Sequence, residues 1–419
     1  MMRLNISHIG KSSRSFSTSH YRKPSILISG AGPSGLVCAL TLKKRGIDAN
    51  IVDLAPNTQH HRGVGIVLQP NATQVLKNLG IFPAIHAAGQ PLLGERVVDR
   101  IGGNLTFNSP YRSVQGVDET GDHIIGIDKQ TLCQILSEGL SVRRQTGIVN
   151  IHKTNVAGEM GYKVALKKSL NSETYNILIG ADSISSKVRS ELFEENAANI
   201  TYPGWGVAYV KMPRPTQFDA NNWLHVWARG RRLVVVPVDK ENVFAWTSYR
   251  SKVPVQQIVT GEKPVETIAH HFSSMENPFA KAVASEIGTA ILGRVWFPAE
   301  VTMKAYTSSH AALIGDAAFA MAPYMLQGVG LGVESGYLLG SLIANAYEKG
   351  ETYESALEKY NEMMIARVKI VRTESNVMGS RLENMGDNRL TAGYRKLMLN
   401  MSPPGKKAQD YLNGNPLTP

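Results

Sequence analysis

The alternation of apolar and polar positions predicts an α/β domain over the first 200 residues. "SILIS", "GAGPSGLVCALTLKKRG" and "ANIVD" in succession predict a buried strand, a glycine turn with an apolar-striped helix ended by Gly46, and a second strand. This βαβ unit begins at residue 25. Further on, "KQTLCQILSEGL" repeats the helical period, "PNATQVLKNLG" predicts a helix capped by Asn71, and "TYNILIGAD" predicts another strand.

Between residues 201 and 300 the pattern changes to short alternating runs such as "NWLHVWARGRRLVVVPV" and "NVFAWTSYR". These runs predict antiparallel strands joined by tight turns, with "RGRRL" at 229–233 as a solvated hairpin. All five tryptophans, at 205, 223, 227, 246 and 296, fall in this stretch. It therefore predicts a second module inserted into the first, because α/β texture returns at "AALIGD". Helical patterns follow over 331–348, 351–380 and 389–401.

The composition indicates a globular protein with an unusual N-terminus. The 419 residues are 43% hydrophobic, and no apolar run approaches the eighteen or so residues of a spanning helix. The formal net charge is +11, but five basic residues lie in the first 23 positions and no acid occurs before Asp48, so the excess is largely in the tail and nucleic-acid binding is not indicated. The serine-rich first 23 residues are typical of a mitochondrial transit peptide, and Arg14, Phe16 and Ser19 resemble a processing site. A disordered tail is the alternative. Residues 403–419 look frayed.

Two cysteines, Cys38 and Cys133, lie inside apolar helical patterns. Their number and placement argue against a disulfide framework or a metal cluster. We expect two buried free thiols.

The first chemical motif is GxGxxG, formed by Gly30, Gly32 and Gly35 at the strand-to-helix turn. Missing side chains there let a pyrophosphate approach backbone amides and the positive end of the helix. Asp53 ends the second strand, where an acid accepts hydrogen bonds from ribose hydroxyls. The context predicts a bound dinucleotide but does not distinguish a nicotinamide from a flavin. No second copy of the motif precedes a strand with a terminal acid, so this fold must hold the resident cofactor.

Two later strands also end on an acid: "NILIGADSISSKVRSEL" on Asp182 and "AALIGDAAFAMAPYMLQGVGLG" on Asp316. With the first motif, these segments resemble the three fingerprints of the single-component FAD-dependent aromatic hydroxylases (class A flavoprotein monooxygenases), which include salicylate, hydroxybenzoate and kynurenine hydroxylases. The resemblance covers residues 24–400. It implies an FAD-binding Rossmann-like α/β domain, an inserted mixed or antiparallel β-sheet substrate domain, and C-terminal helices.

The resemblance also implies roles for single residues. Gly315 and Asp316 would face the ribityl and pyrophosphate part of FAD. Asp182, Ser186 and Arg189 would serve FAD phosphates and transient nicotinamide, although a helix-surface salt bridge is an alternative for Arg189. Pro323 and the start of a helix near Leu331 would line the isoalloxazine. The full cofactor-binding set is Gly30, Gly32, Gly35, Asp53, Arg62, Gly65, Lys129, Asp182, Arg189, Gly315, Asp316, Gln327, Gly328 and Val329.

The chain departs from the family's pattern at several of these positions. Ser183 follows the middle Asp where the family usually has Gly. Phe319 replaces a His after "GDAA". The family's "GQG" followed by Asn is here Leu326, Gln327, Gly328 and Gly330. These departures put in doubt which reaction the reduced flavin performs.

The inserted module supplies candidates for a dry substrate pocket. On "NWLHVW", Trp223, His225 and Trp227 alternate onto one face, so His225 would assist deprotonation of a phenol, with a satisfied core histidine as the alternative. Trp246, Tyr249 and Trp296 are further pocket candidates. The catalytic candidates are thus His225 and Pro323.

The function implied is an FAD-dependent monooxygenase. It would use NADPH or NADH and O₂ to hydroxylate or epoxidise an electron-rich small molecule through a flavin C4a-hydroperoxide. Alternatives are a non-oxygenating reductase or dehydrogenase of a quinone or polyprenyl substrate, and a non-catalytic flavin-binding protein. We expect FAD to be tightly bound and the protein to be a monomer or homodimer, mitochondrial or otherwise cytoplasmic, with no metal.

The expected domain boundaries follow from these patterns. A transit-like tail precedes three parts of the FAD-binding domain, which alternate with two parts of the substrate module and are followed by C-terminal helices and a tail. In order along the chain the segments are 1–23, 24–93, 94–122, 123–200, 201–299, 300–350, 351–402 and 403–419.

Overall fold

The computed structural model describes most of the chain. The described residues are 23–58, 65–99, 124–194, 197–216, 218–250, 269–270, 273, 276–286, 292–296, 299–384, 406–414 and 417–419. The segment with the predicted transit peptide, the loop with Arg62, and the helix predicted over 389–401 lie outside the described residues.

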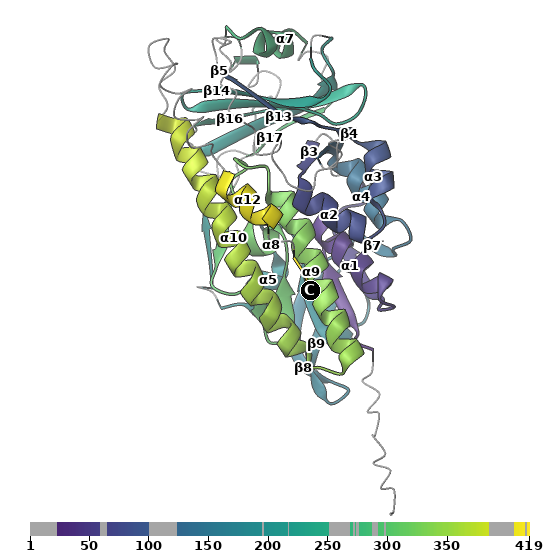
Figure 1. Cartoon of the computed structure of the whole chain (residues 1–419). Helices are drawn as coiled ribbons and strands as arrows, with labels where there is room; N and C mark the ends of the chain where they lie inside the picture. Colours follow the sequence, from purple (N-terminus) through teal and green to yellow (C-terminus); the bar gives the residue numbers. More distant parts are fainter. Residues whose placement is uncertain are drawn as a thin grey trace, which may run out of the picture.

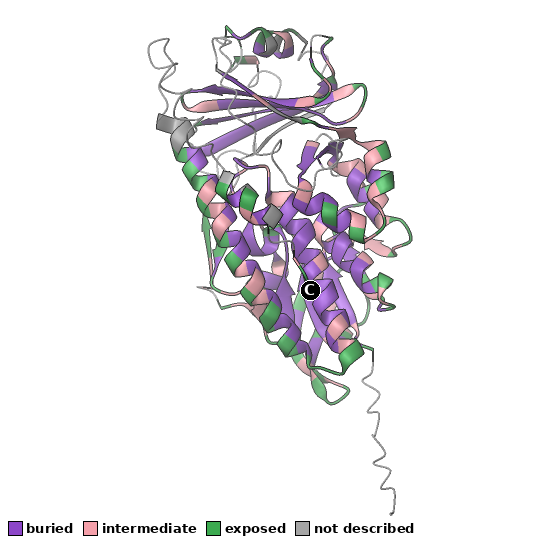
Figure 2. Cartoon of the chain, viewed as in Figure 1, coloured by how far each residue is buried: buried purple, intermediate pink, exposed green. Residues whose placement is uncertain are grey.

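A six-stranded sheet forms the core of the lower half of the molecule in Figure 1. The strand order is β19-β20-β11-β1-β2-β7, and neighbours pair parallel except β19, which is antiparallel to β20. β1 and β11 are buried throughout, as expected for parallel strands covered on both faces (Figure 2). The Rossmann-like prediction is confirmed. The bounds are β1 Ile26–Ser29, β2 Ala49–Asp53, β7 Val142–Arg144, β11 Ile177–Gly180, β19 Thr307–Ser308 and β20 Ala311–Leu313.

Long helices and a small antiparallel sheet surround this sheet (Figure 1). The small sheet has the order β10-β9-β8, and β9 contacts β11. Helix α1 packs on α9 and α4, and α10 packs on α9. The bounds are α1 Pro33–Lys44, α4 Lys129–Ser137, β8 Ile148–Val156, β9 Glu159–Leu166, β10 Glu173–Tyr175, α5 Lys187–Leu192, α8 Asp316–Phe319, α9 Gly328–Lys349 and α10 Tyr353–Asn384.

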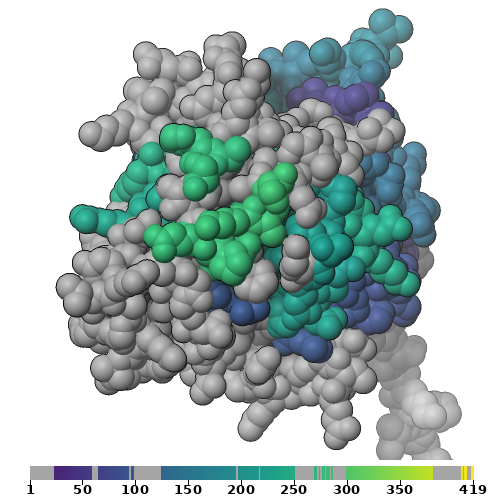
Figure 3. Space-filling model, turned by 90° about the horizontal axis from the view of Figure 1, so that it is seen from above, coloured from purple at the N-terminus to yellow at the C-terminus, as the bar shows by residue number. Residues whose placement is uncertain are grey.

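A second six-stranded sheet lies at the top of Figure 1, and Figure 3 views this end from above. Its order is β17-β13-β16-β15-β14-β5, antiparallel except where β5 pairs parallel with β14. One face packs on α7, where Leu224 and Val226 share a core cluster with Ala280. The bounds are β5 Gly94–Asp99, β13 Trp205–Pro213, β14 Asn222–Ala228, β15 Arg231–Pro237, β16 Asn242–Arg250, α7 Pro278–Glu286 and β17 Leu292–Trp296.

The other face of this second sheet meets the domain of the parallel sheet at two closely packed glycines. A Cβ on Gly126 would overlap the Pro237 carbonyl, and one on Gly65 would overlap the Phe244 ring. Lys211 Nζ lies 3.3 Å from Asp128 Oδ2 across the same junction. The connecting elements are β3 Gly65–Leu68, α2 Pro70–Asn78, α3 Phe82–Ala88, β4 Gln90–Pro91, β6 Ile125–Asp128, β12 Ala198–Thr201 and β18 Glu300–Met303.

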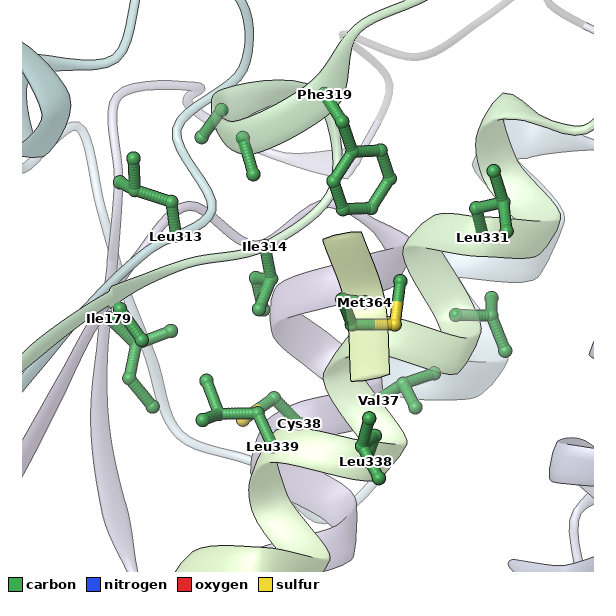
Figure 4. Packing of buried hydrophobic residues seen from close by; sticks show 14 of the residues in the cluster. Val37, Cys38, Ile179, Leu313, Ile314, Phe319, Leu331, Leu338, Leu339 and Met364 are labelled. Atoms are coloured by element: carbon green, nitrogen blue, oxygen red, sulfur yellow. The ribbon is translucent and has the colours of Figure 1, made fainter. Parts of the chain in front are cut away.

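The main core lies between the parallel sheet and the helices α1, α9 and α10 (Figure 4). Val37, Leu331, Leu339 and Met364 pack there with almost no exposure. Cys38 and Cys133 are free and buried, as predicted, and burial raises the pKa of each thiol, to about 12 and about 11. Both therefore behave as apolar packing groups at neutral pH.

Three local predictions were wrong. Residues 406–414 are not frayed but form α12 Lys406–Gly414, which contacts α10 and α2. Helix α2 begins at Pro70 with Gln69 as its N-cap, so Asn71 is not the cap. In the "RGRRL" hairpin Arg232 is buried rather than solvated, because its strand position faces the domain of the parallel sheet.

Candidate functional site

The turn between β1 and α1 brings backbone amides to the carboxyl end of the parallel sheet. Gly30 has a φ of 110°, and a Cβ there would overlap the Ala181 carbonyl, so packing alone requires this glycine. Gly35 likewise leaves room for the Gly30 carbonyl. Gly32 differs, because a Cβ there would meet nothing within 4 Å. The first-turn amides of α1 have no partner within the helix and begin at this open position.

Asp53, at the end of β2, closes the turn. Its Oδ2 accepts from Ala31 N at 2.6 Å and its Oδ1 from Ala55 N at 2.7 Å. Arg144 Nη1 lies 3.9 Å from Asp53 Oδ1, because Arg144 is the register partner of Asp53 on β7. Arg144 was not among the predicted site residues. Its signal was the strand end at "SVRRQTG", since ends of parallel strands share one edge of a sheet.

Asp182 follows β11 at the same edge. Its Oδ2 accepts from Lys187 N at 2.9 Å and from Val188 N at 3.3 Å, whereas its buried Oδ1 has no hydrogen-bond partner. Desolvation raises the pKa of this carboxyl. A buried carboxylate oxygen without a donor is costly. Asp182 therefore has an acceptor available to a ligand hydroxyl.

Arg189 corrects the salt-bridge alternative. Its side chain is buried rather than on a helix surface, and desolvation lowers its pKa. The guanidinium donates to Ala317 O at 2.6 Å and to Ile184 O. Arg189 thus ties the middle motif to α8, the helix that begins at Asp316.

Asp316 follows β20 and the left-handed Gly315, whose φ is 58°. Its side chain is exposed, yet the surrounding protein is dense enough for desolvation to raise the pKa of its carboxyl. Accessibility and desolvation together describe a group recessed into the molecule. Desolvation is the larger effect on the pKa of Asp316, and the charge of Lys129, the first residue of α4, acts against it.

The first turn of α9 completes the set. The helix begins at Gly328, three residues before the predicted start, so the first-turn amides belong to Gly328, Val329 and Gly330. A Cβ on Gly328 would meet nothing within 4 Å. Of the described glycines without a left-handed φ, Gly32 and Gly328 alone have such open surroundings. Packing does not explain either glycine.

These features fit a dinucleotide with a second ring system. Two helix N-termini offer amides to negative charge, at α1 and α9. Asp182 and Asp316 offer acceptors to sugar hydroxyls, and Gly32 and Gly328 leave space for close approach. Ser34 of α1 lies between Gly315 and Gly332, which joins the two helices and β20 at one place.

The protein-family model described as "FAD binding domain" matches residues 23–375. The chain belongs to this FAD-binding family. It is an FAD-dependent monooxygenase, an oxidoreductase in which FAD receives electrons from NAD(P)H.

Several known proteins are similar to this chain in sequence or fold. The 3-hydroxybenzoate 6-hydroxylase of Polaromonas naphthalenivorans (strain CJ2) is 26% identical over 395 residues, which are 87% of this chain and 90% of that protein. The 2-heptyl-3-hydroxy-4(1H)-quinolone synthase of Pseudomonas aeruginosa (strain UCBPP-PA14) is 25% identical over 354 residues, 84% and 88% of the two chains. The solved structure of Klebsiella pneumoniae HpxO complexed with FAD and uric acid shares the fold at a TM-score of 0.75 and 17% identity, over 93% and 96% of the two chains.

The residues predicted to bind FAD occupy one edge of the parallel sheet of this monooxygenase, with exceptions. Arg62 lies outside the described residues, and Gly65 leaves room for Phe244. Gln327 is buried, and its side-chain amide bonds to Gln69 and Asn71, so its backbone is what adjoins the first turn of α9. Gly330 packs against the side-chain amides of Gln327 and Asn71, so the space beside it is not open to a flavin. Val329 is half-buried against the main core.

The predicted pocket residues divide between two faces of the second sheet. Trp223, His225 and Trp227 share the face toward the FAD-binding domain, and Trp246 lies there too. Tyr249 was wrongly grouped with them. It lies three positions from Trp246, hence on the opposite face, and belongs to the cluster under α7. Trp296 is on β17, and its side chain is outside the described set.

Arg232, which the sequence analysis took for a hairpin residue, is at the centre of this aromatic face. Its guanidinium carbon lies 5.2 Å from the centre of the Trp246 ring. It donates to Tyr324 O at 2.9 Å and contacts His225 Nδ1 at 3.1 Å. Tyr324 belongs to the loop that carries Pro323 and leads to α9. Arg232 therefore joins the aromatic face to the loop beside the cofactor edge.

Desolvation first, and the charge of Arg232 second, lower the pKa of His225 well below 6.5. The imidazole is therefore neutral at physiological pH. Phe319, which replaces the family's usual His, is buried in the core and packs against Tyr306 at 5.6 Å between ring centres.

Proposed function

We propose that the enzyme hydroxylates an electron-rich aromatic or heteroaromatic small molecule held against the aromatic face of the second sheet. The observation that carries this proposal is that face itself, on which Trp223, Trp227 and Trp246 lie together with the polar pair His225 and Arg232. One similar protein is named a hydroxylase of 3-hydroxybenzoate and another a synthase of a 3-hydroxy-4(1H)-quinolone, and both compounds contain rings of this class.

Bound FAD supplies the two electrons taken from NAD(P)H and the activation of dioxygen. One oxygen atom enters the ring and the other leaves as water, with NAD(P)⁺ formed. The tryptophans exclude water and offer flat surfaces for a ring. In this proposal Arg232 stabilises the phenolate of a phenolic substrate, and the single nitrogen lone pair of neutral His225, which faces Arg232, orients the guanidinium. Pro323 would line the ring of the cofactor from the loop before α9.

The proposal is tested with purified yellow protein, NADH and NADPH, and a panel of phenols, benzoates, hydroxyquinolones and other aromatic heterocycles. We expect a substrate to accelerate NAD(P)H oxidation and consume oxygen, and ¹⁸O₂ to label the product by one atom. Substrate turnover that continues without oxygen and leaves the product unlabelled would instead identify a quinone or polyprenyl reductase. Flavin that NAD(P)H never bleaches would favour a binding protein.

His225 has a separate test within this reaction. The variant His225→Ala removes the acceptor that orients Arg232. We expect kcat for a phenolic substrate to fall about 100-fold, in the range found for loss of one group that stabilises an oxyanion, while flavin binding is unchanged. Equal kcat values for the two proteins at every pH would remove His225 from the mechanism.

We also propose that residues 1–23 direct the enzyme to mitochondria and that the protein is a monomer or homodimer. The support for the first is compositional: five basic residues and no acid. A fluorescent protein fused after residue 23 should enter mitochondria, and the same fusion with Arg3→Glu and Arg14→Glu should not. Light scattering of the full chain tests the assembly. No helix in the described ranges is long and apolar enough to cross a membrane.

A further inference from the structure

A chain of buried polar side chains runs from α10 to the first turn of α9. Arg367 of α10 forms a buried ion pair with Glu334 of α9, in which Nε donates to Glu334 Oε2 at 2.9 Å. Asn71 of α2 donates through Nδ2 to the same Oε2 at 3.1 Å and to Gln327 Oε1 at 3.2 Å. Gln327 in turn donates to Gln69 Oε1. These five residues are called the relay below.

The relay lies in the protein interior. Gln69, Gln327, Glu334 and Arg367 are each 1% exposed, and Asn71 is 7% exposed. A buried ion pair rarely stabilises a fold more than apolar residues of the same volume would. Fold stability is therefore a weak reason for this arrangement.

The relay contacts both the N-terminus of α9 and the loop that precedes it. Gln327 is its N-cap, and a Cβ on Gly330 would lie 2.7 Å from Gln327 Oε1 and 3.3 Å from Asn71 Nδ2. Gly330 is thus kept small by the relay. Gln69 Nε2 donates to Met325 O at 2.8 Å, which holds the loop immediately before α9. The relay therefore clamps residues 325–330 from two sides.

We infer that the Glu334–Arg367 ion pair, acting through Asn71 and Gln327, positions the first-turn amides of α9 against the flavin. Asn71, Glu334 and Arg367 are positioning residues in this proposal, not catalytic ones. The amides of Gly328 and Val329 stabilise the negative charge that FAD gains on reduction, and this stabilisation depends on their placement. Loosening the relay should therefore make bound FAD harder to reduce. The inference rests on FAD binding and not on the identity of the substrate.

The test is the midpoint potential of FAD in the holoenzyme, measured by equilibration with a redox dye. We expect Asn71→Ala to shift the oxidised-to-reduced ratio of FAD about tenfold toward the oxidised form at a fixed potential, or about 30 mV for a two-electron couple. Asn361→Ala is the matched control. It removes the same side chain and a 2.7 Å bond to Tyr306 N, but it lies outside the relay. We expect it to lower stability without moving the potential.

A second variant keeps the test decisive if Asn71→Ala does not fold. The double variant Glu334→Leu/Arg367→Met removes both charges together, which proteins tolerate better than the loss of one. We expect it to bind FAD, to shift the potential in the same direction, and to form more hydrogen peroxide per NAD(P)H. Wild-type potentials in both Asn71→Ala and the double variant would overturn the inference and leave the relay a structural element. Because no substrate enters the potential measurement, a failed substrate screen does not affect this result.

Discussion

Ser183 has a left-handed backbone conformation, with a φ of 67°, at the position where the related hydroxylases usually have Gly. Leu326, which takes the place of the first Gly of "GQG", also has a positive φ of 57°. At both departures the chain thus has a left-handed backbone at a residue whose side chain disfavours it. A left-handed conformation costs a residue with a Cβ about 1–2 kcal/mol.

Replacement of Ser183 by Gly should therefore stabilise the protein. The side chain is exposed, so little packing is lost, and relief of strain should outweigh the greater freedom of Gly in the unfolded chain. We expect Ser183→Gly to raise the free energy of unfolding by about 0.5–1 kcal/mol in urea titrations. Ser185→Gly, two residues on and without a positive φ, is the control and should lower it. A loss of stability in Ser183→Gly would contradict the strain.

His225 gives the stability a dependence on pH. Its pKa is lowered in the folded protein, first by desolvation and then by Arg232, whereas the unfolded chain titrates near 6.5. Below pH 6.5 the unfolded state binds the extra proton, so the free energy of unfolding should fall as pH falls, by up to about 1.4 kcal/mol per pH unit.

The measurement is the difference in the free energy of unfolding between wild type and His225→Gln, from pH 7.5 to pH 5. The raised pKa values of Asp182 and Asp316 act in the opposite direction, but they are present in both proteins and cancel in the difference. We expect the variant to lose less stability than the wild type below pH 6.5. Parallel curves would show that the folded His225 accepts a proton normally.

At the scale of elements, α1 and α9 meet along a line of glycines. Gly332, Gly336 and Gly340 are spaced four residues apart, and Cβ atoms on them would press on Ser34, Cys38 and Thr41 of α1. Side chains four apart lie on one helix face, so the missing side chains let the two helices approach closely. The glycines of α9 thus have three separate causes: open space at 328, the relay at 330, and helix packing from 332 onward.

Alanine substitutions at Gly336 and Gly328 should distinguish helix packing from open space as the reason for each glycine. Gly336→Ala brings a Cβ against backbone atoms of Ser34 and Cys38, so we expect it to lower the free energy of unfolding by about 1–3 kcal/mol. Gly328→Ala should leave FAD-free stability unchanged but weaken FAD binding about tenfold or more, measured by fluorescence titration. Wild-type FAD affinity in Gly328→Ala would show that the open space there is not used by the cofactor.

At the scale of the whole molecule, α12 returns the C-terminal residues to the cofactor domain (Figure 1). Ala408 and Leu412 join the main core, and Tyr411 lies 5.8 Å from the Arg367 guanidinium carbon. We expect Leu412→Ala to lower the free energy of unfolding by about 2–3 kcal/mol in urea titrations. Lys407→Ala, on the exposed side, is the control and should have almost no effect. Equal stability of both variants would mean that α12 is not docked in solution.

The joining of the two sheets is also a property of the whole molecule. Arg232 connects β15 to the loop before α9, and Lys211 connects β13 to Asp128 beside α4. The aromatic face and the cofactor edge are thus linked by side chains that are 92 and 83 residues apart in sequence.

The sequence by itself determined the parallel sheet and the motifs that gather at one edge of it, and the resemblance to FAD-dependent hydroxylases indicated which cofactor is bound. GxGxxG, Asp53, Asp182 and Asp316 are local signals, because each marks a strand end or a helix start and such ends gather at one edge of a parallel sheet. Two-residue periodicity likewise placed Trp223, His225 and Trp227 on one face.

Only the tertiary structure decided which of these groups are occupied by other parts of the protein. Asn71 and Glu334 are 263 residues apart, and no local pattern marks one as the other's partner. The same holds for Arg232 and Tyr324, for Arg189 and Ala317, and for the docking of α12. Burial and pairing depend on how distant elements pack, whereas a motif records only what its own backbone must do.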